Sequence, residues 1–263
     1  MDDDTSGQSK TEKKGGAGAG KMGGDPFWKW TARCGLGAFM TSFFIGFLAV
    51  PAQSIAIGFG SPALSSLAYG FGTAAIILGT GLVFNQYGGW HHYNPALTIA
   101  GVFCDEGRKW SWPFFFMQVI AGALSFGGYA AAEGINFAIY DFSLFDNTPL
   151  TSQSWFPDFL NETVGLMLLT FIYLFSMRKY EGPWGVFGIA LTNGLLITFY
   201  QAANGGAFNF WRTLASGWIE GNLELTGWSP KLVAAFVAPF FVCFVKMMVY
   251  PEKMTGMMGS RKQ

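Results

Sequence analysis

The chain has 263 residues, of which 51% are hydrophobic and 18% aromatic but only 12% charged. This charged fraction is about half the usual share of a soluble domain, so the composition excludes an ordinary soluble protein and favours a membrane protein. The formal net charge is zero, and no basic face predicts nucleic-acid binding.

The chain begins with a polar, glycine-rich segment, residues 1–26. Such a composition cannot bury a core, and the segment lacks the apolar run of a secretory signal. We therefore expect disordered tails at 1–26 and 251–263, with a single domain at 27–250 between them.

Six apolar stretches are long enough to cross a hydrocarbon layer of about 30 Å, which takes about 20 helical residues each. They lie at roughly 34–57, 62–84, 113–132, 159–177, 183–203 and 232–250. Their many small residues allow close helix packing in a membrane. The sequence therefore predicts an all-α membrane protein with six spans.

Basic residues gather on one side of these spans. They are Lys10, Lys13, Lys14, Lys21, Lys29, Arg33, Arg108, Lys109, Arg178, Lys179, Lys253, Arg261 and Lys262. The opposite connections, 51–66 and 131–160, contain no Lys or Arg, and the second carries Glu133 and several aspartates. By the positive-inside rule we expect a multi-pass protein with both termini in the cytoplasm.

Three cysteines, Cys34, Cys104 and Cys243, are too scattered to form a disulfide framework or a metal site. We interpret them as small, buried and reduced side chains.

An internal repeat links two short segments. Tyr93 to Ala100 recurs 115 positions later as Phe208 to Ala215, so that Asn94 corresponds to Asn209. Each copy follows the second span of a three-span half, about 30–132 and 155–250. The halves must therefore cross the membrane in opposite senses, and such an inverted repeat places functional groups at the midplane.

In each copy, a glycine-containing loop leads into an apolar segment too short to span the membrane. Irregular backbone at this depth is tolerated only where it is buried in protein or lines a cavity. We therefore expect two re-entrant half-helices that begin at Asn94 and Asn209. Their N-termini would point backbone N–H groups and positive dipole ends at a central pore.

The segment HYNPALTIAG resembles the first signature box of aquaporins and aquaglyceroporins, with Asn94, Pro95 and Ala96 as its Asn-Pro-Ala. Gly206, Asn209 and Arg212 resemble the second box, whose arginine belongs to the selectivity filter. Glu162 and Gln118 resemble supporting positions of the family. The resemblance implies an aquaporin-like channel domain over 27–250, assembled as a homotetramer with one pore per subunit.

Two departures from the family pattern stand out. Cys34 replaces a glutamate that the family usually carries in its first span, so we expect a slack first loop. Phe210 and Trp211 replace Pro and Ala in the second box, and two large rings where the half-helices meet would narrow the pore.

The resemblance assigns roles to the pore residues. Asn94 and Asn209 would each direct an amide N–H into the lumen, while the half-helix dipoles repel protons and cations. Arg212 would face a water-filled cavity, because a charge at that depth is costly, and would offer donors to the solute. His92 matches a histidine at the cytoplasmic mouth that could narrow the pore or respond to pH, whereas His91 is expected to be satisfied within the loop.

The rest of the filter is matched position by position. Tyr69 matches the second-span aromatic, with Phe71 as a rival register, and Gly206 matches the loop position. Ile197 matches the fifth-span position, with Leu195, Gly194 and Tyr200 as alternatives if the alignment slips. No histidine occurs at this last position, which favours a wider, more apolar filter of the kind found in glycerol-conducting relatives.

The resemblance thus implies a passive channel for water and small neutral solutes such as glycerol, surrounded by membrane lipid and closed to protons and ions. The alternative is a non-conducting, aquaporin-like structural subunit whose pore is plugged by Phe210 and Trp211. No nucleophile, metal or phosphate-loop pattern predicts an enzyme, a cofactor or a metal site.

Overall fold

The structure is a computed structural model, which describes residues 27–58, 60–84, 90–104, 112–140, 155–179, 183–204, 208–221 and 225–249. Every regular element in these ranges is a helix. The predicted tails, 1–26 and 251–263, lie outside the described residues, as does Gly206.

The described residues form six long helical spans and two short helices. In chain order they are α1 (Phe27–Phe44) continued by the π-helix η1 (Ile45–Ala49) and α2 (Val50–Gly58), then α3 (Pro62–Phe84), the 3₁₀-helix η3 (Trp90–Tyr93), α4 (Pro95–Cys104), α5 (Trp112–Tyr140), α6 (Trp155–Lys179), α7 (Pro183–Asn204), α8 (Phe210–Glu220) and α9 (Leu225–Val249). The predicted fold class, six spans with two half-helices, is confirmed. Some boundaries are wrong: α5 continues to Tyr140, so Glu133 lies buried within a helix and not in an outer connection, and α9 begins at Leu225 and not at 232.

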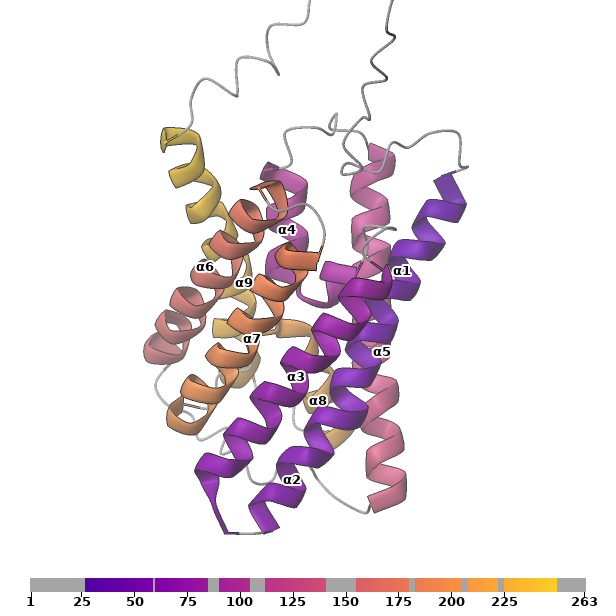
Figure 1. The fold of residues 1–263 in the computed structure, drawn as a ribbon, viewed down its shortest axis with the longest axis vertical. Helices are drawn as coiled ribbons and strands as arrows, with labels where there is room; N and C mark the ends of the chain where they lie inside the picture. The colour runs from indigo at the N-terminus through magenta and orange to yellow at the C-terminus, as the bar shows by residue number, and fades with distance from the viewer. Residues whose placement is uncertain are drawn as a thin grey trace, which may run out of the picture.

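The helices pack as two interlocked halves. In the first half α1 packs against α5, and in the second half α6 packs against α9. The two halves contact each other where α3 packs against α7. Each short helix contacts the opposite half, α4 packing on α9 and α8 on α5. Figure 1 shows α4 and α8 in opposite halves of the molecule, with the start of α1 and the end of α9 at the same end. This is the expected inverted repeat.

Glycines allow the long helices to approach closely. A Cβ on Gly128 of α5 would lie 2.5 Å from the carbonyl oxygen of Phe39 in α1, and one on Gly70 of α3 would lie 2.5 Å from the carbonyl oxygen of Gly194 in α7. Neither position has room for a side chain. The small residues of the sequence thus set the helix spacing, as membrane packing requires.

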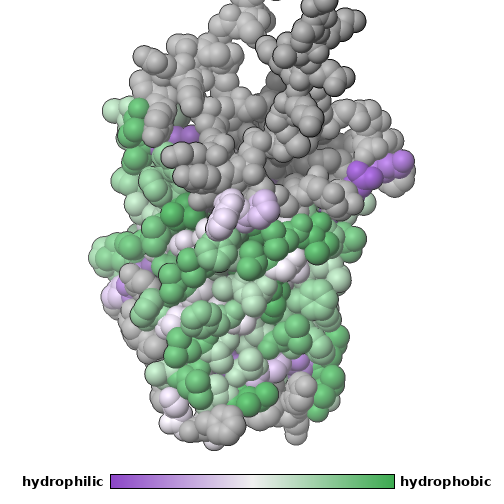
Figure 2. Space-filling model, in the orientation of Figure 1, coloured by the Kyte–Doolittle hydropathy of each residue, from purple (hydrophilic) through white to green (hydrophobic). Residues whose placement is uncertain are grey.

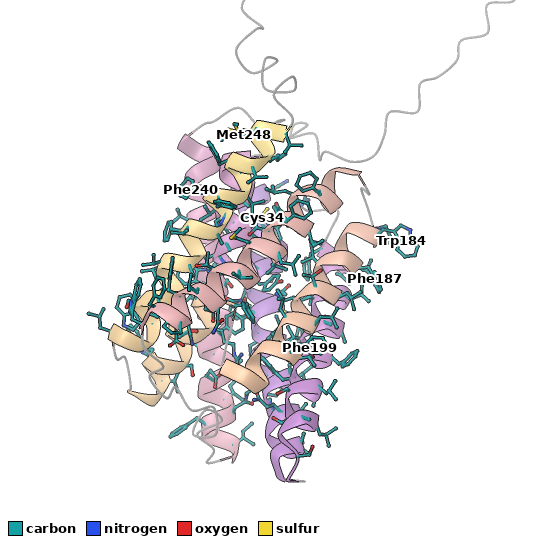
Figure 3. All side chains as sticks on the ribbon, turned by 90° about the vertical axis from the view of Figure 1, so that its left-hand side faces the viewer. Cys34, Trp184, Phe187, Phe199, Phe240 and Met248 are labelled. Carbon is teal, nitrogen blue, oxygen red and sulfur yellow. The ribbon has the colours of Figure 1, made fainter. Side chains whose placement is uncertain are left out.

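The lateral surface is apolar. Four stretches of the described residues are long and apolar enough to cross a membrane, Thr31–Gln53, Ala63–Phe84, Trp155–Phe175 and Gly227–Val249. Hydrophobic side chains cover the middle of the face in Figure 2. In Figure 3, Trp184, Phe187 and Phe199 project outward from α7. This exposure of large apolar side chains suits a lipid environment.

Cys34 and Cys243 are buried, as expected. However, Cys243 is disulfide-bonded, so the prediction that all three cysteines are reduced is wrong.

Candidate functional site: the centre of the bundle

The two repeated asparagines bind each other's loops. Asn94 Nδ2 donates to the carbonyl of Phe208 (2.7 Å), and Asn209 Nδ2 donates to the carbonyl of Tyr93 (2.8 Å). Donors and acceptors are related by the same offset of 115 residues that relates the two sequence segments. A reciprocal pair of buried hydrogen bonds therefore joins the two repeats at the centre of the bundle.

Each asparagine also caps the half-helix that follows it. Asn94 Oδ1 accepts from the N–H of Ala96 (3.0 Å), and Asn209 Oδ1 accepts from the N–H of Trp211 (3.1 Å). An asparagine at this position satisfies one of the helix's unpaired N–H groups and stabilises it by about 1 kcal/mol. Because the caps use the oxygens, the amide protons remain available to donate to other groups.

Phe208 holds the second box in place. Its φ of +46° is the one positive φ among the described non-glycine residues, a conformation that costs a side chain roughly 1–2 kcal/mol. Its N–H donates to Oε1 of Glu162 (3.2 Å), and its ring packs on α6 where Gly165 leaves room. Glu162 thus contacts the backbone just before Asn209.

The first box has different support. The hydroxyl of Ser125 in α5 donates to the carbonyl of Tyr93 (3.1 Å) and hydrogen-bonds to the hydroxyl of Ser42 in α1 (2.5 Å). From α7, Asn193 Nδ2 donates to the hydroxyl of Tyr93 (2.8 Å). These contacts anchor the loop that we expected to be slack without a carboxylate at position 34.

The rings of Phe210 and Trp211 pack against neighbouring helices. Phe210 lies near Trp228 of α9, with ring centroids 6.3 Å apart. Trp211 lies against Gly122 and Phe126 of α5. Seven residues, about two helical turns, separate Trp211 from Trp218, which is 64% exposed and also contacts Phe126. The face of α8 that carries Trp211 and Trp218 is therefore directed to the periphery, whereas Phe210 is buried, with 6% exposure.

Arg212 lies one turn into α8 and is almost fully buried, at 4% exposure. Its Cζ stands 4.2 Å from the centroid of the Tyr69 ring, a cation–π distance. The rival residue, Phe71, is 61% exposed on the outside of the bundle. The structure thus brings Tyr69, and not Phe71, to Arg212.

The structure describes some of the other positions that the resemblance assigns to a filter. Ile197 is buried one turn beyond Asn193 on α7, so it shares the face that contacts the first box. Of its alternatives, Leu195 is exposed and Gly194 packs against α3. The side chains of Tyr200 and Gln118 lie outside the described part of the chain, as does Gly206.

Both histidines are buried in η3, just before α4 begins. His92 Nδ1 is 3.1 Å from the hydroxyl of Thr98, one turn into α4. His91 lies against Tyr173 of α6, with ring centroids 5.1 Å apart. His91 therefore packs between elements, whereas the sequence predicted only a histidine satisfied within its loop.

Sequence reasoning missed several polar residues of the centre. Tyr129 and Glu133 are buried one turn apart on α5, and Lys231 is buried on α9. Lys231 interacts electrostatically with Glu162 and with Asp158. Spacing along α5 offered one signal, since Tyr129, Glu133 and Asn136 recur at helical intervals on one face.

The described residues form six spans and two half-helices that enter the bundle from opposite ends, and the two asparagines bond each other's loops. This arrangement defines an aquaporin-like membrane fold. No family model matches the chain, and no curated protein matches it. Among solved structures, the chain is similar to the X-ray structure of the aquaglyceroporin from Plasmodium falciparum, with a TM-score of 0.57 and 19% identity. The alignment covers 86% of this chain and 98% of that one.

Proposed function

We propose that the protein is a passive channel for water and small neutral solutes such as glycerol, and that it excludes protons and ions. The observation that carries this proposal is the reciprocal bonding of Asn94 and Asn209, each at the N-terminus of a half-helix. Two helix N-termini that meet inside an apolar bundle concentrate positive dipole ends and amide donors at one point. Such a centre favours neutral solutes that carry an acceptor oxygen.

Arg212 supports the same function. A buried guanidinium held over the Tyr69 ring provides donors to a solute and an electrostatic barrier to cations. Tyr69 and Ile197 would form the apolar side of the filter, while Gly206 would complete the ring. We extend the proposal to a homotetramer, with one pore in each subunit.

The alternative function, a non-conducting subunit of a membrane assembly, is favoured by one observation. Asn94 has 0% exposed surface and Asn209 has 6%, so a water-sized molecule barely reaches either side chain.

Stopped-flow measurements on proteoliposomes test the proposal. We expect volume changes in water and glycerol gradients to be faster than in empty liposomes, with no faster decay of an imposed pH gradient. Arg212→Ala should keep solute flux and speed the decay of the pH gradient, because it removes the buried positive charge. Rates equal to those of empty liposomes would favour the alternative, unless a variant opens the pore.

A further inference from the structure

Tyr129 of α5 reaches the centre of the bundle. Its hydroxyl accepts from Asn209 Nδ2 at 3.0 Å, and the same nitrogen donates to the carbonyl of Tyr93 at 2.8 Å. An amide nitrogen carries two protons. Both donors of Asn209 are therefore engaged within the protein.

The two asparagines differ in this respect. Each asparagine donates one amide proton to the loop of the other repeat. In a conducting pore, the second amide proton would hydrogen-bond to the solute. At Asn209 the hydroxyl oxygen of Tyr129 takes that place. The repeat offers no equivalent at Asn94, because the residue 115 positions after Tyr129 is Phe244, which is exposed on α9.

The Tyr129 side chain is buried among the polar residues of the centre. Tyr129 is 1% exposed and its hydroxyl is bonded by Asn209, and its electrostatic neighbours include Tyr69, Tyr93 and Arg212. Gly122 and Phe126, earlier on the same face of α5, instead contact the peripheral Trp211. Tyr129 is thus the residue of this face that contacts Asn209.

We propose that Tyr129 closes the pore, with its hydroxyl standing where the oxygen of a passing solute would bind Asn209. This inference rests on the proposed channel function and names Tyr129 as the residue that opens and closes the pore. Conduction requires the ring to swing away and a water to replace its hydroxyl. A neutral hydrogen bond contributes little net stability, because the water that replaces it bonds almost as well, so the closed state can open.

The test compares wild type with Tyr129→Ser, Tyr129→Phe and the control Phe137→Ser in the same proteoliposomes. Tyr129→Ser removes the ring, and we expect water permeation at least about tenfold faster than in wild type, since the closed state is lost. Tyr129→Phe keeps the packing volume but frees the ring from Asn209. Loss of one hydrogen bond should shift the equilibrium by about three- to tenfold. Phe137 is exposed on the same helix, so Phe137→Ser should match wild type.

The outcomes separate this inference from the proposed function. If wild type conducts and neither Tyr129 variant is faster, Tyr129 does not close the pore, although the channel stands. If wild type matches empty liposomes and the Tyr129 variants conduct, both proposals are supported. If folded Tyr129 variants also match empty liposomes, both proposals fail. Tyr129→Phe covers the case in which Tyr129→Ser does not fold.

Discussion

At the scale of single residues, the contact between Phe208 and Gly165 gives a sharp prediction. A methyl group at position 165 would overlap the Phe208 ring, which cannot retreat because its backbone is held by Glu162 and Asn94. Gly165→Ala should therefore cost about 1–3 kcal/mol, as overpacking of a tight core does, and lower the midpoint of thermal unfolding in detergent.

The matched control for that variant is Gly127→Ala on α5. A Cβ there meets nothing within 4 Å, and alanine is favoured over glycine in a helix by up to about 1 kcal/mol. Gly127→Ala should unfold at the same temperature as wild type or slightly higher. Equal midpoints for the two variants would show that Phe208 can move, contrary to its role in fixing the second box.

How much of the site the sequence predicted depends on the kind of residue. Asn94, Asn209, Arg212 and Glu162 stand in a repeat or motif, so their places near the centre could be inferred from the sequence alone. Tyr129 could not, because a tyrosine in an apolar helix is usually an ordinary core residue. Its importance depends on the rotation of α5, which local sequence does not determine.

At the scale of elements, the start of α8 predicts opposite effects of proline at adjacent positions. Phe210 is the first residue of α8, and Asn209 before it is already extended, at φ −155° and ψ 103°. Proline is well tolerated at a helix's first position and favours an extended residue before it. We therefore expect Phe210→Pro to be at least as stable as Phe210→Ala, the control variant that also lacks the phenyl ring.

The next residue behaves differently. The N–H of Trp211 donates to Asn209 Oδ1, and a proline there would remove this donor and disfavour the helical conformation of Phe210. Trp211→Pro should be less stable than Trp211→Ala by about 1–3 kcal/mol. Thermal unfolding of the four variants measures both differences. A penalty at position 210 equal to that at 211 would mean that α8 does not begin at Phe210.

The helix boundaries show why element prediction was incomplete. We expected the last span to begin at 232, after Lys231, yet α9 begins at Leu225. A hydropathy pattern ends a span at a charge, whereas the fold buries Lys231 within α9, at 7% exposure. The π-helix η1 was also missed. There Asn136 donates to the carbonyl of Gly46 (2.9 Å), a long-range contact that no local pattern in α1 could reveal.

At the scale of the whole molecule, charge predicts orientation. The start of α1, with Lys29 and Arg33, lies at the same end of the bundle as the end of α9 (Figure 1). Toward the opposite end of the bundle, the described basic residues Arg212 and Lys231 are both buried. They therefore add no exposed positive charge to that end, which agrees with the positive-inside rule.

We therefore expect both termini in the cytoplasm and the turn after α2 outside. Epitope tags at either end should resist protease in intact cells and be digested only after permeabilisation. Gly58→Cys, exposed at the end of α2 with nothing within 4 Å of its Cβ, should react with a membrane-impermeant maleimide in intact cells. Wild type, which carries the three native cysteines, sets the background of labelling. Digestion of the tags in intact cells, with labelling of position 58 only after permeabilisation, would reverse the orientation. It would leave the fold unchanged, because an inverted repeat presents a half-helix from each side whichever way the chain is inserted.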